Sequence, residues 1–309
     1  MEVTKANISA NPLLPELVGK EAETLYILGN GFDIYHNLKT RYSDFRQWLS
    51  DSGDSKKRTF VDDMENTFPL ETDQDMLWSN FENALGKYRE WIIYDTYHKQ
   101  NAHRNSHLSD DEMVKDMQRL CEDIPRYMTE WAESISKNAE PLLCLSDKSF
   151  YLTFNYTRLL EDIYKISPSQ ICHIHGKVGS GLVITGHNYE RDEKGQYDDD
   201  YMQELLKSFN QLLKNTEEQI KKHEYFFNRL KDVTHVVVIG HSLDQIDMDY
   251  FKKVARSVAP NVKWHFTRYK KKDRFTVYDF IDNMNGLIKE RGTDITLPQK
   301  LNKESKEKQ

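Results

Sequence analysis

The segment Leu25-Tyr-Ile-Leu-Gly-Asn-Gly-Phe-Asp-Ile34 decides the fold predicted for this chain. Residues 25–28 form a short apolar run that is typical of a buried strand, and the run stops at Gly29-Asn30-Gly31. A glycine turn of this kind accepts positive φ and exposes backbone N–H groups. A buried strand that runs into such a turn, with helical sequence soon after, is the local plan of a nucleotide-phosphate site. Ordinary tight turns have the same pattern, so the segment alone leaves both interpretations open.

Further apolar runs follow along the chain and alternate with segments of helical spacing. The runs expected to be strands cover residues 150–154, 171–174, 182–185, 233–239 and 262–266. The expected helices cover residues 42–49, 158–165, 248–258 and 277–288, the first with Thr40 as its N-cap. This alternation predicts a parallel sheet with right-handed crossovers, and the continuous apolar strands predict cover on both faces. The sequence therefore predicts an α/β fold with a Rossmann-like, doubly wound, mostly parallel sheet.

Two helical insertions interrupt the sheet in the predicted domain plan. The first covers about residues 60–140, where apolar residues repeat at helical spacing, and Pro125 is expected to kink or interrupt its second long helix. The second insertion covers about residues 200–230, and its pattern predicts one helix with a polar face. Around them we expect a loose leader at residues 1–20, a single domain at 21–290 with an acidic loop at 189–201, and a disordered tail at 291–309.

Composition restricts the class of protein and its location. The net charge of -7 argues against broad nucleic-acid binding, although a basic run at residues 270–274 leaves a local nucleic-acid site as the alternative to a solvated surface. No apolar run approaches the roughly 20 residues of a membrane span, and the first residues lack the pattern of a secretory signal. The three cysteines, Cys121, Cys144 and Cys172, are odd in number and far apart, which fits a reducing cytoplasm.

Several predicted strands end in polar or glycine residues. These ends are Gly29-Asn30-Gly31, Asn155, His175-Gly176 and Gly240-His241-Ser242. Ligands of open α/β sheets bind at the carboxyl ends of the strands, so we expect these residues to share a pocket. Asn155 can fix a water or a carboxamide through its amide, and His175 can act as a general base toward a hydroxyl. The alternative is structural, with Asn155 capping the next helix and His175 a hydrogen-bonded histidine at a strand end.

Two other kinds of site have weaker support. Gly240-His241-Ser242-Leu243 is similar to the nucleophile elbow of hydrolases, but Asp244 stands where that motif requires glycine. Ser242 instead suits an anion or a ribose at the start of a helix, whose first turn Asp244, Asp247 and Asp249 are expected to cap and charge. A metal site is not expected, because the histidines do not form a His-Glu-x-x-His pattern.

A set of short motifs occurs in a specific order over most of the chain. They are Leu28-Gly-Asn-Gly-Phe-Asp-Ile34, Tyr42-Ser-Asp-Phe45, Phe154-Asn-Tyr-Thr157 with Glu161, His173-Ile-His-Gly176, and Ile239-Gly-His-Ser-Leu243 with Asp247. In this order they resemble the AbiH family of bacterial abortive-infection proteins. The resemblance implies a cytoplasmic protein that acts in defence against bacteriophage.

The same motifs are similar to those of sirtuin-like NAD-binding domains. A Gly-Ala-Gly turn and an Asp-Phe-Arg segment frame the nucleotide there, and Gly29-Asn30-Gly31 and Asp44-Phe45-Arg46 match them here. The resemblance implies that Asn155 lies near the nicotinamide, that His175 belongs to the sirtuin His-Gly pair, and that Gly240-His241-Ser242 contacts the adenosine ribose. The zinc-ribbon cysteines of sirtuin deacylases are absent, so lysine deacylation is not expected.

One position departs from the sirtuin pattern inside the nucleotide-binding turn. Asp33 stands where sirtuins carry a serine near the phosphates. A carboxylate at that place is expected to repel a pyrophosphate unless it turns toward a ribose hydroxyl or is neutralised.

Together the motifs imply an antiphage effector that hydrolyses the N-glycosidic bond of NAD or a related nucleotide, without a metal. Asn155 would orient the attacking water or the nicotinamide amide, and His175 would hydrogen-bond or deprotonate a ribose hydroxyl. The alternative is a non-catalytic sensor of a nucleotide such as ADP-ribose, whose helical insertions transmit occupancy to a defence-system partner or a homo-oligomer. Both hypotheses expect a small-molecule nucleotide as the ligand, and neither expects a membrane.

Overall fold

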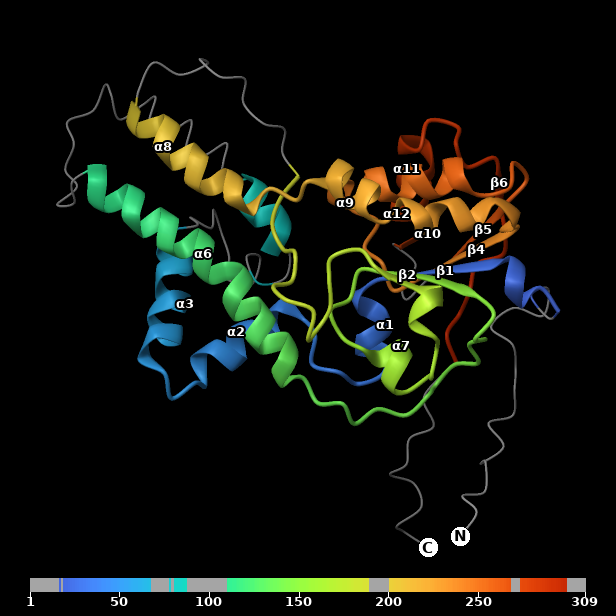
Figure 1. Ribbon diagram of the computed structural model, residues 1–309, viewed down its shortest axis with the longest axis horizontal. Coiled ribbons are helices and arrows are strands. Elements are labelled where there is room, and N and C mark those ends of the chain that lie inside the picture. The colour runs from blue at the N-terminus through green and yellow to red at the C-terminus, as the bar shows by residue number, and fades with distance from the viewer. Residues whose placement is uncertain are drawn as a thin grey trace, which may run out of the picture.

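The computed structural model describes residues 17, 19–67, 78, 81–87, 110–188, 200–267 and 273–298. Within them, one parallel sheet has the strand order β3-β2-β1-β4-β5-β6 (Figure 1). The strands are β1 (Thr24–Leu28), β2 (Phe150–Thr153), β3 (Ile171–His173), β4 (His235–Ile239), β5 (Lys263–Phe266) and β6 (Glu290–Arg291). The predicted α/β class with a parallel Rossmann-like sheet is confirmed, and the order is that of doubly wound dinucleotide-binding sheets.

The strand order reverses at the centre of the sheet, between β1 and β4. From β1 the chain builds outward to β2 and β3, and then returns to place β4 on the other side of β1. In the register of these strands Leu28 lies beside both Thr153 and Ile239. The segments that follow β1, β2 and β4 therefore leave the sheet side by side at its carboxyl edge, which is where ligands of such sheets bind.

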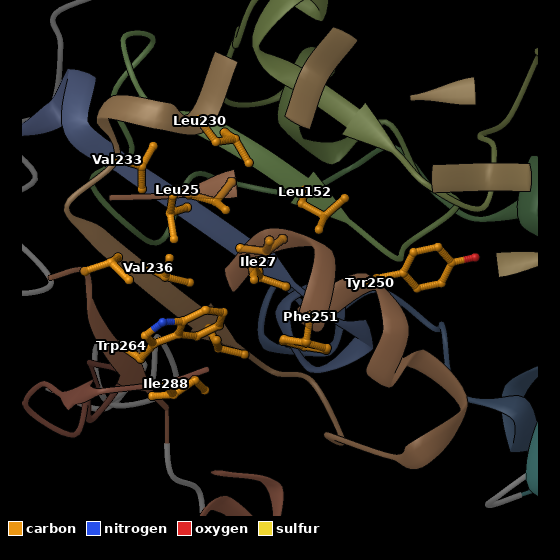
Figure 2. Packing of buried hydrophobic residues seen from close by; sticks show 14 of the residues in the cluster. Leu25, Ile27, Leu152, Leu230, Val233, Val236, Tyr250, Phe251, Trp264 and Ile288 are labelled. Carbon is orange, nitrogen blue, oxygen red and sulfur yellow. The ribbon is translucent and has the colours of Figure 1, made fainter. Parts of the chain in front are cut away.

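Helices cover both faces of the sheet because side chains alternate along each buried strand. Leu25 and Ile27 pack with Phe251 and Trp264 on one face (Figure 2), whereas Tyr26 and Leu28 join a second core on the other face. The first face carries α9 (Thr216–Lys222), α10 (Glu224–Asn228), α11 (Met248–Ser257) and α12 (Asp273–Asn283), and the second carries α1 (Asn30–Tyr35) and α7 (Leu159–Asp162) (Figure 1). Short 3-10 helices are η2 (Glu21–Glu23), η3 (Pro168–Gln170), η4 (Asn210–Leu212), η5 (Arg229–Asp232) and η6 (Gln245–Asp247).

The remaining helices form a lobe beside the sheet, on the left in Figure 1. This helical lobe consists of α2 (Tyr42–Ser50), α3 (Ser55–Thr67), α6 (Asp110–Ser134) and α8 (Asp200–Phe209), together with Trp78 and residues 81–87. Its core is rich in aromatic rings: Phe45, Trp78, Phe81 and Trp131 are all buried, and Phe45 contacts the other three rings. The lobe thus begins before the predicted first insertion and takes only α8 from the second, because α9 and α10 cover the sheet.

Three local predictions were wrong, each for an identifiable reason, and one strand was not predicted. Helix α6 is not interrupted at Pro125, because packing of the buried residues around it outweighs one lost backbone hydrogen bond, whereas the expected kink there stays a prediction. Residues 182–185 are not a strand, since Gly181 and Gly186 on either side have φ of 106° and 149°. The helix expected over 202–230 stops after η4, where Leu213 is extended, and a new helix, α9, starts at the N-cap Asn215, whose side chain accepts a hydrogen bond from Glu218 N. The two-residue, charged strand β6 has no sequence signal.

Some predictions lie wholly or mostly outside the described residues. They concern the leader, the acidic loop, the basic run at 270–274 and most of the tail. For the part of the chain that is described, no helix combines the length and apolar character needed to cross a membrane.

Candidate functional site

A cavity of about 970 Å³ opens at the carboxyl edge of the sheet, against the helical lobe. Nearly all of the residues predicted to bind or to act on a nucleotide line it: Gly29, Asn30, Gly31, Asp33, Arg46, Asn155, His175, Gly240, His241 and Ser242. The exception is Phe45, which the structure places in the aromatic core of the lobe. The lobe contributes Tyr42, Trp78, Glu82 and Trp131 to the opposite part of the lining, so the site lies between the two parts of the molecule.

The glycines of the first turn are required by close packing of two chain segments. A Cβ on Gly29 would lie 2.5 Å from the Cα of His241, and one on Gly31 would lie 2.7 Å from the Cα of Gly240. Gly240 is equally restricted, since its own Cβ would lie 2.4 Å from Phe32 N. The loops after β1 and β4 therefore touch backbone to backbone, which only glycine permits.

The same contact uses two of the three N–H groups of the turn that were expected to be exposed for a phosphate, those of Gly29 and Gly31. Gly29 N donates to the carbonyl oxygen of Ile239, and Gly31 N donates to that of Gly240 at 2.8 Å. The expected positive φ is also absent, because Gly29 has a φ of -102° and caps helix α1, which begins at Asn30. Asn30 uses its side chain to hold the loop before α2, donating to the carbonyl oxygen of Thr40 at 2.7 Å.

Asn155 follows the carboxyl end of β2 and is held there by Asp33. The amide nitrogen of Asn155 donates to Asp33 Oδ1 at 2.8 Å and to the carbonyl oxygen of Gly29 at 3.1 Å. Thr157 Oγ1 donates to the other carboxyl oxygen of Asp33 at 2.7 Å. Both hydrogens of the Asn155 amide are thus used, so its Oδ1 is the group left to accept a hydrogen bond from a ligand. The alternative in which Asn155 caps the next helix is wrong, because helix α7 has Arg158 as its N-cap.

Asp33 is buried and bonded to neutral donors. Burial raises the pKa of its carboxyl group from 3.8 to about 7, against the lowering effect of the bonds from Thr157 and Asn155. A carboxyl group with this pKa is partly neutral near pH 7, and its two oxygens are occupied by protein donors. The repulsion that a free carboxylate at this position would exert on a phosphate is therefore reduced.

His175 is buried at the end of β3 and packs edge-on against Phe154 and Tyr250. Its Nε2 atom has no hydrogen-bond partner among the residues that the structure describes, which contradicts the alternative of a hydrogen-bonded structural histidine. Burial, and next the charge of Lys214, holds the pKa of His175 well below its usual range. The ring is therefore neutral near pH 7 and can accept a proton or a hydrogen bond. His173, two residues earlier, lies against Glu161, at 3.2 Å from its Oε1.

A buried charged cluster at this edge contains side chains that the sequence did not identify as functional. Lys214 Nζ lies 2.6 Å from Glu82 Oε1 and 4.0 Å from Asp247 Oδ1. Asp247 was expected to cap helix α11, but it makes no side-chain cap there although it occupies the N-cap position. Glu82 and Lys214 stand in helical and loop segments without any motif, and only the AbiH-like spacing around Asp247 gave a signal.

The polar groups of the cavity wall determine which kind of cofactor the site can bind. The cavity wall offers hydrogen-bonding side chains and two arginines, Arg41 and Arg46, which suits a polar organic ligand. In the described part of the chain, no group of three or more His, Cys, Asp or Glu side chains is arranged to hold a metal ion.

Comparison with protein-family models gives a match that covers most of the chain. The family model of bacteriophage abortive infection AbiH matches residues 25–268. No curated protein and no solved structure matches the chain significantly. The matched range includes the glycine turn after β1, Asn155, His175 and the loop after β4, and it contains all described residues that line the cavity except Thr276 and Val277. The chain belongs to the AbiH family of bacteriophage abortive infection.

Proposed function

We propose that this AbiH protein binds a nucleotide in the cavity and hydrolyses the N-glycosidic bond of NAD or a related nucleotide, as an effector of abortive infection. The observation that carries the proposal is the presence of Asn155 and His175 in one cavity of about 970 Å³ at the switch point of the sheet. Ligand sites of proteins have volumes of about 300–1,000 Å³, so a nucleotide fits. The family membership supports the role in defence.

Each of the two residues has a role that its surroundings support. Asn155 Oδ1 accepts a hydrogen bond from the attacking water or from the nicotinamide amide, because its Nδ2 is held by Asp33 and Gly29. His175, neutral through burial, accepts a hydrogen bond or a proton from a ribose hydroxyl. Removing that proton increases the electron density of the ribose and stabilises an oxocarbenium-like transition state.

The test is nicotinamide release from NAD by the purified full-length chain, measured by chromatography. We expect Asn155→Ala and His175→Ala to lower the rate by at least about 100-fold, the usual contribution of positioned acid–base groups. His235→Ala is the matched control, because that histidine is as buried as His175 but begins β4, at the opposite edge of the sheet from the cavity, and does not line it. Circular dichroism verifies that each variant folds. No release by the wild type in phage-infected extracts, or equal release by all variants, contradicts the catalytic proposal.

A second function, ligand sensing without turnover, has one structural feature in its favour. The helical lobe and the sheet edge both line the cavity, so a bound nucleotide contacts both parts of the molecule. Calorimetry with ADP-ribose distinguishes the two functions, since the sensor predicts saturable binding without release of any product, and an oligomeric state that changes with the ligand.

A further inference from the structure

The carboxylate of Asp247 is fixed from two sides although it lies in the interior. His241 Nε2 lies 3.5 Å from Asp247 Oδ2, and Lys214 Nζ lies 4.0 Å from Asp247 Oδ1. Burial opposes ionisation, but the charge of Lys214 and the hydrogen bond from His241 hold the pKa of Asp247 well below its usual range. Asp247 is therefore a buried carboxylate that remains charged at neutral pH.

The orientation of His241 is fixed by the backbone after β4. Leu243 has a φ of 64°, in the left-handed region, and its N–H donates to His241 Nδ1 at 3.0 Å. A neutral imidazole that accepts at Nδ1 carries its hydrogen on Nε2. His241 thus presents Nε2–H to Asp247 Oδ2, and the other carboxylate oxygen is left for a different donor.

That other oxygen faces His175. Asp247 Oδ1 and His175 Nε2 are 3.8 Å apart, both are buried, and neither has a hydrogen-bond partner in the described part of the chain. Phe154 and Tyr250 pack edge-on against the ring of His175, and Nε2 is the ring nitrogen that lies near Asp247. A shift of less than an ångström on ligand binding would complete the hydrogen bond.

We propose that Asp247 is a positioning residue for His175: it accepts the Nε2–H of His175 and thereby leaves Nδ1 unprotonated toward the cavity. The use of Nδ1 as the acceptor for a ribose hydroxyl rests on the proposed function, whereas the tautomer itself does not. The charged or titratable groups that act on His175 are Lys214, Asp247, His241 and His223, and Asp247 alone among them offers an acceptor to its Nε2.

The substitution Asp247→Asn changes this arrangement in a defined way. His241 Nε2–H still requires an acceptor, so the amide oxygen occupies the place of Oδ2 and the amide NH₂ turns toward His175. An NH₂ group there donates to Nε2, which forces the hydrogen of His175 onto Nδ1. Nδ1 then no longer accepts from the cavity, although the shape of the side chain is unchanged.

The experiment reads the tautomer directly by ¹⁵N NMR of the histidine rings in the full-length chain, with His175 assigned from a His175→Gln variant. We expect the Nε2–H tautomer in the wild type and the Nδ1–H tautomer in Asp247→Asn. Asp249→Asn, an exposed position on the same helix, is the control and should leave the wild-type tautomer unchanged. An Nδ1–H tautomer in the wild type overturns the proposal, and this result is available even if Asp247→Asn does not fold. An unchanged tautomer in a folded Asp247→Asn variant overturns it as well.

Kinetics add a second readout that separates this inference from the proposed function. With NAD as substrate, Asp247→Asn should lower kcat by at least about 100-fold and leave KM within about twofold, because the ligand loses a base and keeps its other contacts. Wild-type kcat in that variant overturns the positioning role. A wild type that releases no nicotinamide contradicts the proposed function, and the NMR result then decides the positioning role alone.

Discussion

Asp33 makes the stability of this protein depend on pH in an unusual direction. Its carboxyl group is buried and its pKa is raised from 3.8 to about 7, so the folded state binds the proton more tightly than the unfolded state. A group of this kind contributes stability below its unfolded pKa, and that contribution is lost as the pH rises toward the folded pKa. Carboxylates that gain ionic partners on folding act in the opposite direction, because those partners lower their pKa.

The magnitude follows from the two pKa values. Between about pH 5 and about pH 8, linkage gives a loss of roughly 2.5 kcal/mol in the free energy of unfolding from Asp33 alone. Asp33→Asn removes the titration and keeps the geometry, since the amide oxygen accepts from Asn155 and the amide NH₂ donates to Thr157. The variant should therefore become more stable than the wild type as the pH rises.

The assay is urea unfolding of the wild type and Asp33→Asn at several pH values over this range. The quantity of interest is the difference between the two free energies of unfolding, because it cancels all other titrating groups. Asp62→Asn, on the exposed face of α3, controls for the loss of one negative charge. Parallel pH profiles for the wild type and Asp33→Asn would refute the assignment of a raised pKa to Asp33.

Two further predictions concern packing and charge at the same site, both measured by urea unfolding. Gly31→Ala places a Cβ 2.7 Å from the Cα of Gly240, where only backbone can move, so it should lower the free energy of unfolding by about 1–3 kcal/mol or more. In the control Gly53→Ala the new Cβ meets nothing within 4 Å, so the free energy of unfolding should fall by less than about 1 kcal/mol. Lys214→Met leaves two buried carboxylates without their cation, so it should lower the free energy of unfolding by about 3–5 kcal/mol at neutral pH. Part of that free energy should be recovered in acid. The control Lys207→Met, at an exposed lysine, should change the free energy of unfolding by less than about 1 kcal/mol. Equal effects within either pair would contradict the corresponding contact.

The sheet could be predicted from the sequence because its signals are local. The run from Leu25 to Leu28 is buried on both faces, so apolarity alone marks it as a strand, and the ends of the strands follow from the glycine and polar residues after them. Parallel topology then brings these ends to one edge. For this reason Asn155 and His175 were placed at one site before their surroundings were known.

The interactions that hold these two residues could not be predicted, since they join distant parts of the chain. Asp33 and Asn155 are separated by 122 positions, and nothing near Asp33 in the sequence indicates its partner. Asp247 carries a strong local signal for helix capping, and this signal was misleading, because its side chain turns to His241 instead. Phe45 follows the sirtuin-like spacing but belongs to the aromatic core, which forms only when the helices of the lobe meet.

Two buried carboxyl groups support the site in different protonation states, one partly protonated and one ionised, and each state follows from the donors around it. Asp33 accepts hydrogen bonds from the neutral donors Asn155 and Thr157 and is partly protonated near pH 7, whereas Asp247 lies near the cation of Lys214 and stays ionised. Ionisation of Asp33 strengthens its hydrogen bond from Asn155, because a charged acceptor binds a donor more strongly. Raising the pH through about 7 should therefore fix Asn155 more firmly while it lowers the stability of the fold, and Asp33→Asn should abolish both effects together. Stability and the order of the candidate site are thus coupled through a single proton.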